Sequence, residues 1–156
     1  MDLSRLREQF AQYLTVVEPD QDTAEWWAGA PSVCRDAEGV FWMACRMREG
    51  DSPRGRRGYE IRLLRSDDGE RFEPVHSLRR EDVPIPGFER PALLFDRASG
   101  RFSLYACGPY GDGPWCILRF DDAASPTEFV ASTGRPVIVP DPPGADPRRN
   151  AVAGYK

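Results

Sequence analysis

The side chains in this sequence best suited to ligand chemistry are aromatic rings and guanidinium groups. Trp26 and Trp27 are adjacent in a predicted loop, where two indoles are costly to expose to water. They either fill a core or line a ligand surface, and sugar rings stack well on indole. Arg46 ends a predicted strand and Arg57 lies in the loop that follows. Both could reach a ligand or remain solvated and ion-paired, and the arginine fork suits sugar hydroxyls and carboxylates.

A second aromatic pair flanks a Gly-rich loop. Tyr110 and Trp115 enclose the letters GDGP, which form either a loop hanging over a binding site or a simple turn with aromatic packing. His76 is the only histidine, and without a placed nucleophile or metal partner we expect it at the surface. The cysteines are spread singly and lack the paired spacing of a zinc or redox centre: Cys34, Cys45, Cys107 and Cys116. We therefore expect buried free thiols, no metal and no cofactor.

The composition indicates a folded chain of short strands and frequent turns. The 156 residues are 40% hydrophobic and include 15 prolines and 14 glycines, many for a helical protein. A formal net charge of −4 provides no electrostatic attraction for nucleic acid. No secretory signal opens the chain, and no apolar run reaches the roughly 18 residues of a membrane span. The sequence thus predicts a cytoplasmic protein with no nucleic-acid or membrane partner.

Two similar segments follow each other along the chain. Each offers a proline, an apolar run, a turn ending in glycine and an aromatic strand, and Pro31 and Pro91 are 60 residues apart (91 − 31). Such a period indicates a repeat whose unit cannot bury its own faces. For the first repeat we predict hairpin strands within 30–46, a third strand over 58–66 and a fourth from Phe72. For the second we predict strands over 91–96, 101–107, 115–120 and 128–131, with an extended edge piece over 134–140.

Four antiparallel strands per repeat are the blade of a β-propeller. We place blade 1 at 26–85 and blade 2 at 86–150, within a domain spanning 26–156. Residues 1–25 read as a short helix and a linker, because Leu3, Leu6, Phe10 and Leu14 have helical spacing. The predicted fold class is all-β, a partial propeller with a short N-terminal helix. Since propellers typically close with four to eight blades, we expect either a longer chain or a homodimer that completes the propeller.

The sequence resembles the five-bladed β-propeller glycoside hydrolases of family 43, the arabinanase and xylosidase group, with their invertase-like relatives. The resemblance rests on AGAPSV (28–33), ERPALLFD (89–96), the SDDGERF turn and the strand GRFSLYAC. It covers two blades of five. In that family, three carboxylates ring a central funnel as base or nucleophile, general acid and orienting residue. A carboxyl separation of about 5 Å suits retention, and about 6.5 to 9.5 Å suits inversion.

Carried over by position, the resemblance makes Glu89 a candidate catalytic carboxylate. Arg90 is then its neighbouring substrate clamp or pKa partner. Ala30 stands before Pro31, where the family has an acid. The final AGYK (153–156) is similar to the approach to a third blade. One carboxylate is thus matched, one is replaced and one is missing.

These observations favour a carbohydrate-active, glycosidase-like propeller that binds a saccharide, incomplete for hydrolysis as this chain. The predicted substrate-binding residues are Trp26, Trp27, Arg46, Arg57, Arg90, Tyr110 and Trp115. The alternative is a noncatalytic glycan-binding or scaffold module, which the loss of the acid at Ala30 favours. A third reading is a fragment without independent function.

Overall fold

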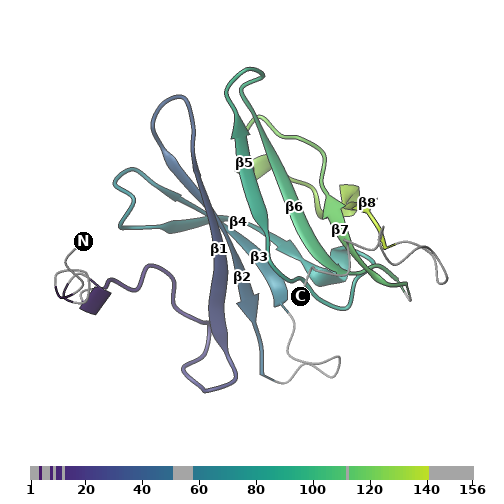
Figure 1. The fold of residues 1–156 in the computed structure, drawn as a ribbon, viewed down its shortest axis with the longest axis horizontal. Helices are drawn as coiled ribbons and strands as arrows, with labels where there is room; N and C mark the ends of the chain where they lie inside the picture. The colour runs from purple at the N-terminus through teal and green to yellow at the C-terminus, as the bar shows by residue number, and fades with distance from the viewer. Residues whose placement is uncertain are drawn as a thin grey trace.

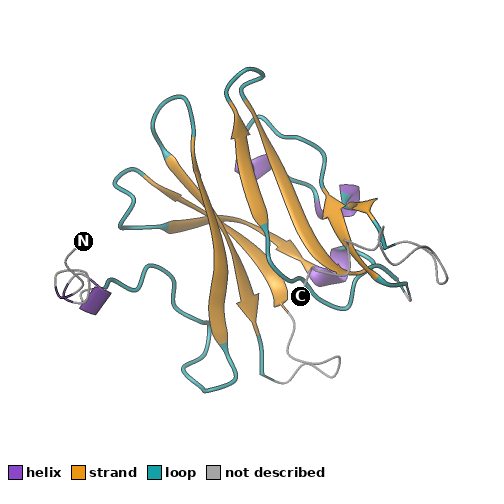
Figure 2. Ribbon diagram, in the orientation of Figure 1, coloured by secondary structure: helices purple, strands orange, loops and turns teal. Residues whose placement is uncertain are grey.

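The computed structural model describes residues 4, 8, 10–11, 13–50, 58–111 and 113–140. The strands form two four-stranded antiparallel sheets, each with its strands in sequence order (Figures 1 and 2). Sheet 1 contains β1 (Trp27–Arg35), β2 (Phe41–Arg48), β3 (Gly58–Ser66) and β4 (Glu73–Arg79). Sheet 2 contains β5 (Ala92–Asp96), β6 (Arg101–Pro109), β7 (Trp115–Arg119) and β8 (Arg135–Ile138). The prediction of an all-β chain with two such sheets is confirmed.

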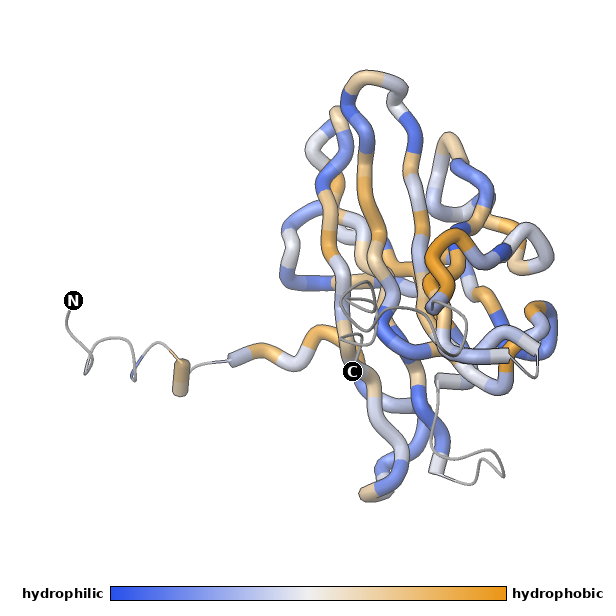
Figure 3. The backbone as a smooth tube through the Cα atoms, turned by 45° about the vertical axis from the view of Figure 1, so that its right-hand side comes forward, coloured by the Kyte–Doolittle hydropathy of each residue, from blue (hydrophilic) through white to orange (hydrophobic). Residues whose placement is uncertain are grey.

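The main core lies between the two sheets. Trp42 and Ala44 of β2 and Ile61 and Leu63 of β3 face sheet 2, because alternate side chains along a strand point to the same face. Sheet 2 contributes the other half of this core: Leu93, Phe102, Leu104, Ala106, Cys116 and Leu118. Figure 3 shows hydrophobic stretches along the strands and several hydrophilic connecting turns. Burial between the sheets is therefore the main force that holds the two repeats together.

A smaller core covers the opposite face of sheet 1. Met43, Cys45 and Met47 of β2 lie there, and Val17 and Trp26 pack against them. The chain before β1 thus covers the outer face of the first sheet. Its attachment includes Asp20, which accepts hydrogen bonds from both terminal nitrogens of Arg62, at 3.0 and 2.8 Å.

The first strands of the two sheets, β1 and β5, lie side by side at the centre of the molecule (Figure 1). The Ser32 hydroxyl accepts a hydrogen bond from the Leu93 backbone N–H at 2.9 Å. This bond fixes the position of β5 along the length of β1. Residues that precede β1 and β5 are consequently brought to the same end of the molecule.

One strand prediction is wrong. Residues 128–131 do not form the fourth strand of the second repeat, because Pro126–Glu128 and Ala131–Thr133 are 3-10 helices, η2 and η3. The Ser125 hydroxyl accepts a hydrogen bond from the Thr127 N–H and caps η2, and Pro126 suits a helix start. The fourth strand is β8, within the segment predicted as an edge piece.

The predicted N-terminal helix is not seen as an element. Residues 1–3, 5–7, 9 and 12 lie outside the described residues, and of the rest Ser4, Glu8, Phe10 and Ala11 have helical backbone. Phe10 and Leu14 are 80% and 64% exposed, so these two side chains of the predicted apolar face are not buried. Among the described residues, no helix is long and apolar enough to cross a membrane.

Candidate functional site

Glu89 is held at the junction of the two sheets by backbone hydrogen bonds. Phe88 exchanges two hydrogen bonds with Gly58 of β3, N–H to carbonyl oxygen, at 2.8 and 2.7 Å. The Glu89 N–H donates to the Cys107 carbonyl of β6 at 2.8 Å. A Cβ at Gly58 would lie 2.8 Å from the Phe88 carbonyl oxygen and 2.5 Å from Arg46 Cγ. The absence of a side chain at Gly58 thus allows the chain before β5 to approach sheet 1.

The Glu89 carboxylate forms an ion pair with the guanidinium of Arg46. The Arg46 side chain is 6% exposed and that of Glu89 is 24% exposed, so the pair is largely desolvated on the arginine side. Burial, and then the positive charges of Arg48 and Arg90, lower the pKa of Arg46 to about 10. Arg46 therefore remains a cation at neutral pH and offsets the charge of Glu89.

Trp27 adds an aromatic surface beside this ion pair. The guanidinium carbons of Arg46 and Arg48 lie 4.7 and 5.0 Å from the centre of its ring. These distances are typical of cation–π contacts. A Cβ at Gly29 would be 2.0 Å from the Trp27 ring, so the indole lies directly against the backbone of β1. At 38% exposure, part of the ring remains open to solvent.

Arg90 is the exposed cation of the group. Its side chain follows Glu89 directly, and its charge is close enough to Arg46 to contribute to the lowered pKa of Arg46. The Arg90 carbonyl oxygen accepts a weak hydrogen bond from the Cys107 thiol at 3.9 Å. Trp27, Arg46, Glu89 and Arg90, which we call the Glu89 site, are thus gathered at one end of the sheets. The group offers a neutralised carboxylate, an exposed cation and an indole, which together can contact a polar ring-shaped ligand.

Comparison with known proteins identifies the architecture. No protein-family model matches the sequence, and the search of curated proteins found no relative. Among solved structures, the GH43_1 enzyme from Xanthomonas citri complexed with xylotriose matches with a TM-score of 0.56 at 18% identity. The match covers 75% of this chain and 34% of that enzyme.

CoXyl43, a GH43 β-xylosidase/α-arabinofuranosidase from a compost microbial metagenome, matches with a TM-score of 0.55 at 14% identity. That structure contains xylotriose and is calcium-free, and the match covers 80% of this chain and 39% of that enzyme. The chain has the fold of part of a GH43 enzyme. It spans between a third and two fifths of the length of these enzymes. The resemblance inferred from the blade-opening phrases is confirmed at the level of the fold.

Within this partial GH43 fold, the predicted site residues separate into two groups. Trp27, Arg46, Glu89 and Arg90 are brought together. Trp26 is not, because it packs in the outer core of sheet 1, with its ring centre 5.8 Å from that of Tyr59. Tyr110 packs partly against the main core. Trp115 begins β7 and pairs with Pro109 of β6, two residues beyond Cys107. Arg57 lies outside the described residues.

Ala30 is the position where the GH43 resemblance expects an acid, and its backbone is unusual. Its φ is 51°, in the left-handed region, and the pairing of β1 with β2 shifts register between Gly29 and Ser32. Ala30 therefore lies in a β-bulge in the first strand of the partial GH43 fold. Bulges next to functional sites often re-aim a side chain, but here the side chain is a methyl group. The structure supplies no carboxylate at this point.

The sequence analysis missed Arg48 and Gly58. Arg48 follows Arg46 by two residues, so both arginines extend the face of β2 that begins with Trp42 and Ala44. The alternation W-x-A-x-R-x-R could have indicated that this apolar face ends in two cations. Gly58 opens β3, and nothing local distinguishes it. Its role depends on the approach of Phe88, which comes from the following repeat.

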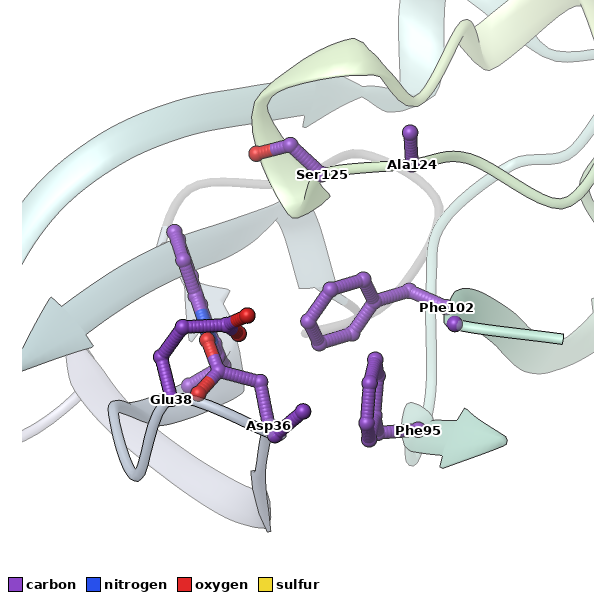
Figure 4. A pocket seen from close by; sticks show the side chains of 9 residues that line it. Asp36, Glu38, Phe95, Phe102, Ala124 and Ser125 are labelled. Atoms are coloured by element: carbon purple, nitrogen blue, oxygen red, sulfur yellow. The ribbon is translucent and has the colours of Figure 1, made fainter. Parts of the chain in front are cut away.

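A separate cavity of about 240 Å³ lies at the turn end of the hairpins (Figure 4). Figure 4 shows the rings of Phe95 and Phe102 across from the carboxylates of Asp36 and Glu38. Asp36 is committed to the fold, because its two oxygens accept hydrogen bonds from the Val40 N–H at 2.8 Å and from the Trp42 indole N–H at 2.7 Å. The cavity is at the opposite end of β1 and β5 from the Glu89 site.

The cysteines of the partial GH43 fold are free, as predicted. Only Cys45 and Cys116 are buried, while Cys34 and Cys107 are half-buried. Burial raises the pKa of Cys107 above its ordinary value, so its thiol is protonated at neutral pH. No group of three or more histidine, cysteine, aspartate or glutamate side chains in the described part of the chain is arranged to hold a metal ion.

Proposed function

We propose that the chain is the saccharide-binding part of a GH43-type propeller and that the Glu89 site contacts the sugar. The observation that carries the proposal is the Arg46–Glu89 ion pair, held beside Trp27 at the end of the sheets where both blades begin. Indole and guanidinium groups suit the faces and hydroxyls of sugars. The structures matched by this chain include GH43 enzymes with bound xylose and xylotriose, which supports a saccharide as the ligand.

Cleavage of a glycosidic bond would need more than this site contains. Retaining and inverting glycosidases both use a pair of carboxylates, one on each side of the bond. In the described part of the Glu89 site, Glu89 is the one carboxylate, and Ala30 stands where the family has another. Hydrolysis by this chain therefore requires a second acid from further blades. Glu89 would act as one member of the pair, with the Arg46 guanidinium beside it.

The noncatalytic reading stands as the second candidate, and Ala30 favours it. A glycan-binding module can keep the aromatic and arginine contacts after losing an acid. Binding of a saccharide without release of reducing sugar, by the chain in its assembled form, supports this reading. Release of reducing sugar that disappears on substitution of Glu89 supports the enzyme.

The experiment that tests the proposal compares Glu89→Gln with a matched control. Glu73→Gln makes the same chemical change on an exposed residue of β4. We expect wild type and Glu73→Gln to bind xylotriose equally in a calorimetric or NMR titration, and Glu89→Gln to bind at least about fivefold more weakly. Thermal melts of all three variants separate binding from folding. Equal binding of xylotriose by Glu89→Gln and wild type would remove Glu89 from the site.

We also propose that the outer face of sheet 2, which points away from sheet 1, packs against another blade, supplied in the isolated chain by a second copy. This face carries Leu94, 55% exposed, and Ile138, 43% exposed, on the two edge strands. Tyr105, Cys107 and Ile117 are half-buried between them. The contact between sheet 1 and sheet 2 is an example of such packing, because the sides of the two sheets that face each other are apolar and buried. Light scattering is expected to give a dimer mass, and a monodisperse monomer at all concentrations would contradict this assembly.

A further inference from the structure

The charges of the Glu89 site do not balance. Arg46 and Glu89 neutralise each other, whereas Arg90 has no ion-pair partner among the described residues. The guanidinium groups of Arg46 and Arg90 repel each other in this partly desolvated place, and their proximity is electrostatically unfavourable. An anionic ligand would remove that cost.

The hydrogen-bonding capacity of the arginines is also incompletely used. Arg46 is buried and donates from Nη1 to Glu89, while its Nε has no hydrogen-bond partner in the described part of the chain. A buried donor without a partner costs roughly 1–3 kcal/mol, so such groups often mark places where a ligand or water binds. The two other carboxylates that β3 and the preceding chain contribute, Glu60 and Asp20, are committed to Arg62.

We infer that the Glu89 site takes a saccharide that carries a carboxylate, that is, a uronic acid residue. This inference rests on the proposed saccharide-binding function and specifies its substrate class. The sugar carboxylate pairs with Arg90, which projects into solvent beside Glu89. The Arg46 cation prevents Glu89 from repelling the ligand. The solvent-exposed part of the Trp27 ring contacts the sugar ring. A free inorganic anion has no ring to make this contact, so the site should prefer the uronic acid.

The test compares three probes under identical conditions at low ionic strength: methyl β-D-glucuronide, methyl β-D-glucoside and inorganic phosphate. We expect the glucuronide to bind about tenfold more tightly than the glucoside, the gain typical of one charge-assisted hydrogen bond. The preference should decrease as salt is added, because exposed charges are screened.

Arg90→Gln and a matched control identify the residue responsible. Arg97→Gln makes the same change in the exposed turn between β5 and β6, at the far end of the hairpin. We expect the glucuronide preference to disappear in Arg90→Gln and to remain in Arg97→Gln. Thermal melts of Arg90→Gln and Arg97→Gln that match wild type would show that both variants are still folded.

The outcomes separate this inference from the proposed function. Equal affinity for glucuronide and glucoside, together with xylotriose binding, overturns the uronic acid while the saccharide site stands. Phosphate binding that equals or exceeds glucuronide binding, with the same dependence on Arg90, overturns the saccharide carboxylate in favour of a free anion. Failure of every saccharide to bind overturns both proposals.

Discussion

The ion pair between Arg46 and Glu89 joins residues that are 43 positions apart in the sequence. Arg46 belongs to the second strand of one sheet, and Glu89 precedes the first strand of the next. A buried pair of this kind is costly to break, because the remaining charge loses its partner in a desolvated place. The pair thus couples the packing of the sheets to the chemistry of the site.

Also at the residue scale, Ala30 adopts a backbone conformation that favours glycine. Its φ of 51° costs an alanine about 1–2 kcal/mol relative to its preferred regions. We expect Ala30→Gly to raise the free energy of unfolding by about 0.5 kcal/mol, because relief of this strain exceeds the added entropy of the unfolded chain. Urea denaturation monitored by tryptophan fluorescence measures the change.

The matched control is Ala92→Gly in the extended strand β5. There, glycine should lower the free energy of unfolding by about 0.5–1 kcal/mol, since no strain is relieved. Equal destabilisation by both substitutions would contradict a strained bulge at Ala30.

At the scale of elements, β3 and the chain before β5 are fastened to each other through Gly58. A Cβ at this position would displace both Arg46 and the Phe88 carbonyl. We expect Gly58→Ala to lower the free energy of unfolding by about 2 kcal/mol, as overpacking does, and to weaken xylotriose binding. Denaturation and titration of the same variant measure both effects.

Gly100→Ala is the control for this substitution. Unlike Gly58, Gly100 has a positive φ, 68°, and a Cβ there would meet no atom within 4 Å. Gly100→Ala should therefore lose stability through backbone strain and keep its affinity for xylotriose. Unchanged xylotriose binding by a folded Gly58→Ala protein would show that Gly58 does not position the site.

The segment before β1 is attached to sheet 1 by a pH-dependent contact. Hydrogen bonds from Arg62 lower the pKa of Asp20 below its ordinary value of 3.8. The contribution of Asp20 to stability is therefore fully present above pH 3.8 and is lost as pH falls through the lowered pKa. Trp26 ends this segment and packs in the outer core of sheet 1. We expect its fluorescence to change at a lower denaturant concentration at pH 3 than at pH 5.

Asp20→Asn should reduce that pH dependence, because the titrating contact is gone. Asp82→Asn is the control, since Asp82 is exposed and forms no ion pair in the described part of the chain. An identical pH 3 to pH 5 difference in wild type and Asp20→Asn would contradict the role of Asp20.

Most strands could be predicted from the sequence, because their signals are local. β3 is predicted at its observed bounds, and β5, β6 and β7 differ by one or two residues. Alternating apolar residues and Gly-ended turns were sufficient for these elements. The prediction over 128–131 was wrong because Ser125 and Pro126 start a 3-10 helix there.

At the scale of the whole molecule, the site depends on packing between repeats, and this could be predicted only in part. The phrase around Glu89 and the proximity of Arg90 are visible in the sequence. The pairing of Glu89 with Arg46, and the separation of Trp26 from Trp27, follow from how sheet 2 and the preceding chain lie on sheet 1. Trp27 begins β1 and Trp26 directly precedes it, so the two side chains point to opposite sides of sheet 1, whereas the sequence analysis placed both residues in a loop.

The central claim is that a saccharide binds at the end of the sheets where both blades begin. The most direct measurement is an NMR titration with xylotriose that follows the indole N–H signals. We expect the signal of Trp27 and the backbone amides of Glu89 and Arg90 to shift, and the signal of Trp42, buried and bonded to Asp36, to stay unchanged. Shifts confined to Trp42, Glu38 and Gly100, around the cavity at the opposite end, or no shifts at all, would contradict the account.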